Sequence, residues 1–308
     1  MRQVTLLYHD VIEGNRHTES GFADPAAHRY KLQRSVFAKH LQRIHAVLNG
    51  PPITIDRLPH VPQQPTPFTI GFDDGGVSSA TIIAEELGRL DWKGHFFITT
   101  DQIGKPGFVS ETQLRDLDAA GHRIGSHTCS HPNPMAACSE AQLQDEWARS
   151  IARLADILDH PVDVASIPGG AYGKNVARAA AKAGIRWLFT SEPVRQSWQI
   201  GDCTLLGRFG IECEDSPHKA AAFAAEDWKV CAEEWINWNT KKRSNDWPDR
   251  SFTNSALGGK SRKHLEHTDW MSVVALFPKV FSLLMPIDRI GVLPYKLRCE
   301  TLFFISIY

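Results

Sequence analysis

Short apolar runs alternate with helical patterns along the first two thirds of this 308-residue chain, and no other feature of the sequence constrains the fold as strongly. The apolar runs predict strands at residues 4–8, 68–72, 95–99, 123–127, 164–168, 187–190 and 205–211. The patterns between them predict helices at residues 35–48, 78–90, 111–120, 139–158 and 174–183. Because strands that alternate with helices form a mainly parallel sheet, the sequence predicts an α/β fold with a barrel-like sheet.

Two of the predicted helices carry boundary signals. Ser139 is followed three positions later by Gln142, which is the pattern of a capping box at a helix start. An alanine-rich stretch ends at Gly184, and glycine is common just after the last residue of a helix. These signals predict where the fourth helix begins and where the fifth ends.

Residues that can do chemistry follow three of the predicted strands. Asp73 and Asp74 come directly after the second strand. His127 ends the fourth strand, and His131 lies four residues further on. A Pro-Gly-Gly loop at 168–170 ends the fifth strand. In barrel enzymes the carboxyl ends of the strands form the face that holds the active site, so we expect these residues to meet there.

Two imidazoles and one carboxylate make a ligand set for a divalent cation, with positions left open for water and substrate. We expect Asp74, His127 and His131 to hold such an ion. Pro132 favours a turn rather than a helix around the second histidine. Zn²⁺ suits this mixed nitrogen and oxygen set, and Co²⁺, Ni²⁺ or Fe²⁺ also fit. Such a cation would polarise a carbonyl oxygen and lower the pKa of bound water toward about 7, so the set indicates metal-assisted hydrolysis.

Asp73 is the expected general base. Adjacent residues in an extended segment face opposite ways, so a turn at Gly75 and Gly76 must bring both carboxylates toward the cation. The charge of the cation keeps Asp73 ionised at neutral pH, and a base within hydrogen-bond reach of the water can take its proton. In the loop at 168–170, a backbone N–H can come close enough to a ligand to stabilise an oxyanion.

Each motif alone has a simpler interpretation. A single Asp-Asp-Gly is usually a solvated turn, and a Pro-Gly-Gly is usually a loop without function. A single His-x-x-x-His more often belongs to the surface or the core than to a metal site. Their occurrence in order, each after a predicted strand, favours one shared site over three unrelated features.

The composition excludes several classes of function. The net charge is −1, so the charge gives no basis for binding nucleic acid or an anionic membrane. The apolar stretch at 271–287 is interrupted by Pro278, Lys279 and Pro286, and it falls short of the ~20 apolar residues of a membrane span. The first ten residues lack the pattern of a secretory signal, which makes a cytoplasmic location the expectation. The six cysteines include no C-x-x-C pair, so we expect free thiols.

These segments resemble the polysaccharide deacetylase family, carbohydrate esterase family 4, over roughly residues 4–235. The family's first motif, Thr-Phe-Asp-Asp-Gly, is matched by Gly71-Phe72-Asp73-Asp74-Gly75. Its second motif, His-(Ser/Thr)-x-x-His, is matched by His127-Thr128-Cys129-Ser130-His131. The opening Leu7-Tyr8-His9-Asp10-Val11 is similar to the start of the exopolysaccharide-type branch. The resemblance implies a distorted (β/α)7 barrel, a bound divalent metal and removal of N- or O-acetyl groups from a carbohydrate.

The resemblance also implies roles for single residues. It assigns the role of base to Asp73 and the role of metal ligand to Asp74, His127 and His131. It implies that the backbone N–H of Gly169 helps to hold the oxyanion. By the same resemblance His9 lies near the mouth of the site, and we expect both His9 and Tyr172 to contact the substrate.

The chain departs from the family pattern at two places. The third motif of the family usually begins with an arginine that orients the catalytic base, and here Ser166 occupies that position. The last motif of the family supplies a histidine that protonates the leaving amine. His218 is the nearest candidate by order, since no clear equivalent of that motif is present.

The alternation of strands and helices stops near residue 236. We therefore expect a catalytic domain at 1–235 and a tail at 236–308 whose fold the sequence does not predict.

Three other functions remain compatible with these motifs. A hydrolase of the same superfamily that acts on a small amide would use the same site. A relative that binds metal or carbohydrate without turnover would explain Ser166 and the missing acid. A non-haem iron oxygenase ranks last, because its first histidine and its carboxylate usually lie close in sequence, whereas Asp74 lies far upstream of both histidines.

Overall fold

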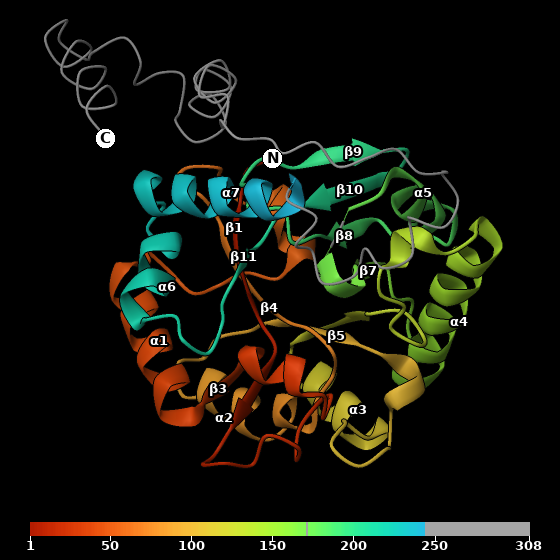
Figure 1. The fold of residues 1–308 in the computed structure, drawn as a ribbon, viewed down its shortest axis with the longest axis horizontal. Helices are drawn as coiled ribbons and strands as arrows, with labels where there is room; N and C mark the ends of the chain where they lie inside the picture. Colours follow the sequence, from red (N-terminus) through yellow and green to blue (C-terminus); the bar gives the residue numbers. More distant parts are fainter. Residues whose placement is uncertain (171, 244–308) are drawn as a thin grey trace, which may run out of the picture. The chain divides into compact units, whose positions relative to one another are not determined.

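The computed structural model describes residues 1–170 and 172–243, and a nine-stranded sheet forms the centre of this part of the chain (Figure 1). Its strands are β1 (Val4–Tyr8), β4 (Phe68–Phe72), β5 (His95–Ile98), β6 (Arg123–Ser126), β7 (Val164–Ser166), β8 (Trp187–Phe189), β9 (Trp198–Ile200), β10 (Cys203–Leu206) and β11 (Phe209–Gly210). The strand order is β11-β1-β4-β5-β6-β7-β8-β10-β9. Neighbouring strands are parallel except β9 and β10. A second, two-stranded sheet joins β2 (Asp10–Ile12) to β3 (Lys31–Gln33).

One chain segment connects the two flanks of the parallel sheet. β10 pairs with β8 through Leu205 and Leu206, and β11 pairs with β1 through Phe209. Gly207 and Arg208 separate these two short strands and turn the chain between the flanks. A Cβ atom on Gly207 would lie 2.3 Å from the carbonyl oxygen of Val194, so this turn has no room for a side chain. The sheet therefore curls toward a barrel instead of staying open.

Helices cover the outside of the curled sheet. They are α1 (Arg34–Val47), α2 (Ile82–Gly88), α3 (Glu111–Ala119), α4 (Glu140–Leu158), α5 (Lys174–Lys182), α6 (Pro217–Ala224) and α7 (Trp228–Arg243). Short 3₁₀ turns lie at Pro25–Tyr30, Ile55–His60, Val77–Ser79, Thr100–Gln102, Met135–Ala137 and Pro168–Gly170. Helix α1 packs against α6, and α4 packs against α5, on opposite sides of the sheet (Figure 1). Every side chain of β1, β4 and β5 is buried, as expected for strands that are covered on both faces.

Two clusters of the described apolar core concern the site, one under the helices and one inside the sheet. The first cluster packs α4 and α5 against the strands, with Trp147, Leu188 and Leu205 at its centre. The second includes Phe97, Phe189 and Leu206 of β5, β8 and β10. The second cluster contacts Arg208, whose guanidinium carbon is 5.7 Å from the ring centre of Phe97.

The α/β fold that the sequence predicts is confirmed, and so are several of its details. β1 and β4 begin and end at the predicted residues. The capping box of Ser139 and Gln142 opens α4, and Gly184 follows α5 with a φ of +94°. The predicted strand at 205–211 is wrong in one respect, because the turn at Gly207 divides it into β10 and β11.

The predicted tail at 236–308 lies almost wholly outside the described residues. Helix α7 runs across the predicted domain boundary and reaches Arg243. Within the described part, no helix combines the length and the apolar character that crossing a bilayer would need. The five cysteines of this part are free, as the sequence predicts.

Candidate metal centre and active site

A tight turn after β4 places two carboxylates side by side. The backbone N–H of Asp73 donates to the carbonyl of Tyr8, and the N–H of Gly75 donates back to the carbonyl of Asp73. Asp74 adopts a left-handed φ of +74°, which few residues other than glycine, asparagine and aspartate adopt readily. This turn brings both carboxylates to the same histidine. Oδ2 of Asp73 is 3.9 Å from Nε2 of His127, and Oδ1 of Asp74 is 3.5 Å from that nitrogen.

The two histidines lie at the ends of a second unusual loop, which follows β6. Thr128 and His131 both have positive φ, of +64° and +62°. The hydroxyl of Thr128 accepts a hydrogen bond from the backbone N–H of His131 at 3.2 Å. The ring centres of His127 and His131 are 5.0 Å apart. The loop therefore folds back on itself and directs both imidazoles to one point.

Asp74, His127 and His131 form a group that can hold a metal ion. One ligand atom from each lies within 4.8 Å of the others, and Oδ1 of Asp74 is 3.5 Å from Nε2 of either histidine. Ligand atoms about 2.1 Å from a tetrahedral Zn²⁺ stand about 3.4 Å apart, so the observed spacing fits such an ion. Nδ1 of His127 lies 2.9 Å from the carbonyl of Ser166, to which it can donate. That bond leaves Nε2 of His127 free to bind the ion, as in other histidine metal sites.

The charges of this group suit a cation. Burial tends to raise the pKa of Asp74, but its bond to His127 and the charges of His9 and His131 outweigh burial and hold the pKa below its ordinary value. Burial lowers the pKa of His131 to about 4. Burial tends to lower the pKa of His127, but Asp73 and Asp74 outweigh burial and raise it. At neutral pH Asp74 is thus ionised and His131 neutral, which are the protonation states that bind metal, and any proton on His127 is released when a cation binds.

Arg208 is the main residue of this site that the sequence analysis missed. Its guanidinium donates to both oxygens of Asp73, at 2.7 and 2.9 Å, and to the hydroxyl of Ser166 at 2.8 Å. That hydroxyl in turn donates to Oδ2 of Asp73 at 3.0 Å. Burial tends to raise the pKa of Asp73, and the positive charge of Arg208 is the main influence that instead lowers it. The signal in the sequence was a single arginine inside an apolar strand pattern, which is unusual for a buried position.

Two other predicted site residues, Gly169 and His9, have unusual surroundings. Gly169 has a φ of +63°, and a Cβ atom there would be 2.6 Å from Oδ1 of Asn133. The ring of His9 lies 4.6 Å from that of Tyr30, and its Nδ1 is buried with no hydrogen-bond partner in the described part of the chain. The charge of His9 also lowers the pKa of Asp74.

Tyr172 lies two residues before α5. It packs edge-on against Trp198, with the ring centres 5.7 Å apart, and it borders the apolar cluster of α4 and α5. The roles predicted for His9 and Tyr172 in substrate binding stay predictions.

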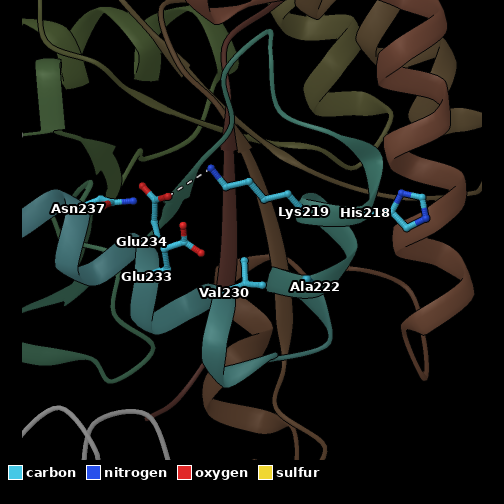
Figure 2. Close-up of a pocket in the computed structure, with 7 residues that line it drawn as sticks. All are labelled: His218, Lys219, Ala222, Val230, Glu233, Glu234 and Asn237. Carbon is cyan, nitrogen blue, oxygen red and sulfur yellow. Dashed lines mark ion pairs between the residues drawn. The ribbon is translucent and has the colours of Figure 1, made fainter. Parts of the chain in front are cut away.

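The structure does not bring His218 into the metal group. This residue lies at the start of α6 in a surface pocket of about 370 Å³ between α6 and α7 (Figure 2). Lys219 and Glu234 line the same pocket and form an ion pair at 3.3 Å. The metal group instead follows β4 and β6, so the role of His218 as general acid stays a prediction.

Comparisons with known proteins agree with this geometry. Residues 60–188 match the family model described as polysaccharide deacetylase. YxkH of Bacillus subtilis (strain 168), which carries a polysaccharide deacetylase name, is 27% identical over 124 residues. This match covers 40% of the present chain and 44% of that protein, which is less than half of either.

Two solved structures share the fold. The deacetylase PplD of Streptococcus pyogenes, solved in complex with acetate, aligns with a TM-score of 0.60 and 18% identity over 71% of this chain and 96% of that one. IcaB of Ammonifex degensii aligns with a TM-score of 0.60 and 21% identity over 73% of this chain and 97% of that one.

Proposed function

We propose that this chain, whose residues 60–188 match the polysaccharide deacetylase family model, is a metal-dependent hydrolase that removes acetyl groups from a saccharide. An N-acetylated sugar is the first choice, and an O-acetylated sugar is the second. The observation that carries the proposal is the position of Asp73, a buried carboxylate only 3.9 Å from a ligand nitrogen of the metal group. A metal group with a base beside it is suited to hydrolysis.

In this proposal Asp74, His127 and His131 hold the divalent cation. Zn²⁺ is favoured by the two imidazoles and by the 3.5 Å spacing, with Co²⁺, Ni²⁺ and Fe²⁺ as alternatives. When bound, the cation would supply Lewis-acid polarisation of the acetyl carbonyl and would lower the pKa of a water to about 7.

Asp73 takes the proton from the attacking water. A carboxylate has about four positions for accepting hydrogen bonds, and Arg208 and Ser166 occupy three of them. The remaining position is available to a water beside the metal group. Because Arg208 keeps the pKa of Asp73 low, this carboxylate is ionised at neutral pH and ready to accept.

The proposed reaction balances as a hydrolysis. The water oxygen bonds to the acetyl carbon, the C–N bond of the amide breaks, and acetate and a free amine leave. The backbone N–H of Gly169 donates to the carbonyl oxygen as that oxygen gains negative charge. The proton that Asp73 accepted can return to the leaving nitrogen, which needs one. On the substrate side, His9 offers a ring nitrogen near the metal group, and Tyr172 offers an aromatic surface.

Acetate release from N-acetylglucosamine oligomers tests the proposal. The protein is depleted of metal with a chelator and then supplied with Zn²⁺. We expect activity only after metal is added, and we expect Asp73→Asn to lose about 10³-fold or more in kcat, within the range reported for general-base catalysis plus charge loss. Equal acetate release by the wild type and Asp73→Asn would show that Asp73 is not the base.

One observation favours a second candidate, a small amide as substrate. The side chains of Asp74 and His131 are only 12% and 20% exposed, which suits a small substrate better than a bulky polymer. A panel of N-acetylglucosamine oligomers of increasing length against small amides distinguishes the two, because a polymer deacetylase should prefer the longer oligomers. Saccharide binding without any acetate release would support a relative that binds but does not turn over.

A further inference from the structure

We propose that Arg208 is the positioning residue for Asp73, in place of the arginine that the polysaccharide deacetylase family usually carries where this chain has Ser166. This inference rests on the proposed function, because it assigns Arg208 to the general base of that reaction. Ser166 taken alone suggests a weakened or inactive site. The contacts of Arg208 point to an intact site in which the arginine comes from another strand.

The first support is the geometry of the ion pair. Arg208 is completely buried, and its two terminal nitrogens bond to the two oxygens of Asp73 at 2.7 and 2.9 Å. A two-pronged contact of this kind fixes the plane of the carboxylate as well as its distance, which a single contact would not do. The orientation of the free acceptor position of Asp73 is therefore set by Arg208.

The second support is that Arg208 is itself held firmly. Its Nε donates to the carbonyl of Thr190 at 2.9 Å, so each of the three guanidinium nitrogens makes at least one hydrogen bond. The rings of Phe97 and Phe189 lie 5.7 and 5.9 Å from its guanidinium carbon. A guanidinium bonded on one edge and packed against two rings has little freedom to rotate, and it can hold another side chain in place.

The third support is the fit between Ser166 and Arg208. The hydroxyl of Ser166 lies between the guanidinium and the carboxylate, at 2.8 Å from Nη2 of Arg208 and 3.0 Å from Oδ2 of Asp73. A long basic side chain at position 166 would compete for the volume that the guanidinium of Arg208 fills. The two positions are thus complementary, and one arginine between them is enough to hold Asp73.

The position of Arg208 in the chain adds a structural reason. It lies in the turn between β10 and β11, where the chain crosses between the two flanks of the sheet. A side chain that points inward from this turn reaches the centre of the curled sheet, and Asp73 approaches the same centre from the end of β4. The element that curls the sheet therefore also delivers the charge that holds the base.

The test compares four proteins in metal binding, folding and acetate release. They are the wild type, Arg208→Ala, the exchanged pair Ser166→Arg with Arg208→Ser, and Arg195→Ala. Arg195 is a matched control, because it is also a buried arginine in an ion pair, with Glu226, and it makes no contact with Asp73 in the described hydrogen bonds and ion pairs. Zn²⁺ affinity is measured by competition with a chelator, and folding by urea titration.

We expect Arg208→Ala to lose about 100-fold in kcat, which is the scale of loss when a catalytic group is misplaced. KM and the Zn²⁺ affinity should change little, because the hydrogen bonds of Arg208 go to Thr190, Asp73 and Ser166 and to no ligand atom of the metal group. Free guanidinium at low concentration should restore part of the lost kcat. The exchanged pair should recover at least about tenfold over Arg208→Ala, since it returns an arginine to the same carboxylate from the other strand.

Three results overturn the inference while leaving the proposed function in place. Full kcat in folded Arg208→Ala shows that Asp73 needs no such partner. A loss of activity that matches Arg195→Ala, and that follows the folded fraction, shows that Arg208 only stabilises the fold. If Arg208→Ala folds poorly, a loss of activity that neither guanidinium nor the exchanged pair restores also shows that Arg208 only stabilises the fold. A wild type that releases no acetate overturns the proposed function and this inference with it. If the wild type is active, the variants test the role of Arg208 separately from the proposed function.

Discussion

Glu146 of α4 accepts two hydrogen bonds from Ser130, one from its backbone N–H at 2.9 Å and one from its hydroxyl at 2.6 Å. The same carboxylate accepts the N–H of Cys129 at 2.8 Å. Thr128 and His131, on either side of these residues, both have positive φ, a conformation that is unfavourable for such side chains. Bonds from outside the loop must offset that cost, and Glu146 supplies three of them.

Glu146→Ala should therefore weaken metal binding without removing a ligand. Loss of its three bonds lets the loop relax, so His131 no longer points steadily at Asp74. Removal of such supporting contacts commonly costs about 10- to 100-fold in metal affinity, and we expect a loss in that range. Competition with a chromophoric chelator measures it. Asp145→Ala is the control, because Asp145 is exposed on the same helix and pairs with Arg149 instead; equal losses in both variants would refute the role of Glu146.

Asp74→Asn should abolish the stabilisation of the protein by metal while leaving the fold intact. Asparagine tolerates the left-handed φ of +74° at this position but lacks the charge that binds a cation. A ligand present at 100 times its dissociation constant stabilises the folded state by about 2.7 kcal/mol, so added Zn²⁺ should raise the melting temperature of the wild type. The variant should melt at the same temperature with and without Zn²⁺. A rise as large as in the wild type would mean that the ion binds elsewhere.

The sequence could predict most of the scaffold because its signals are local. Each predicted strand is a run of apolar residues bounded by polar ones, and the capping box at Ser139 is complete within four residues. The same holds for the motifs around Asp73 and His127, whose ligands follow strand ends and need only the common topology of parallel sheets to meet. The prediction of His131 in a turn also followed from one neighbour, Pro132.

Arg208 and Glu146 could not be found in this way, because their function depends on partners far along the chain. Arg208 is 135 positions from Asp73, and no local pattern predicts the turn that directs its side chain toward Asp73. Glu146 resembles any charged residue of an amphipathic helix until the loop it holds is seen. The division of the strand at 205–211 depends equally on distant contacts, since the carbonyl of Val194 leaves no space at Gly207.

Gly169→Ala should reduce kcat more than it reduces stability. Alanine at a φ of +63° is strained, and its Cβ atom would also lie 2.6 Å from Oδ1 of Asn133, so the backbone N–H proposed to bind the oxyanion must move. Gly201→Ala is the matched control, because its φ is +59° but its nearest neighbour, Ala181, is 4.0 Å away. Both variants should lose about 1 kcal/mol or somewhat more of unfolding free energy from the strain, and only Gly169→Ala should lose about 100-fold in kcat. Equal kcat in the two variants would remove Gly169 from the mechanism.

His95→Gln should make the stability of the protein less sensitive to acid. Burial lowers the pKa of His95 from 6.5 to about 4, and its ring bonds on both sides, to the N–H of Ile55 and the carbonyl of Ile70. Between those two pH values the unfolded chain binds a proton that the folded protein does not. The unfolding free energy therefore falls as the pH drops from 6.5 toward 4, by up to roughly 3 kcal/mol from this residue alone.

Glutamine can keep one donor and one acceptor but does not titrate, so the variant should start less stable at neutral pH and lose less on acidification. Urea titrations of both proteins across this pH range measure the difference, and parallel curves would show that His95 does not cause the acid sensitivity.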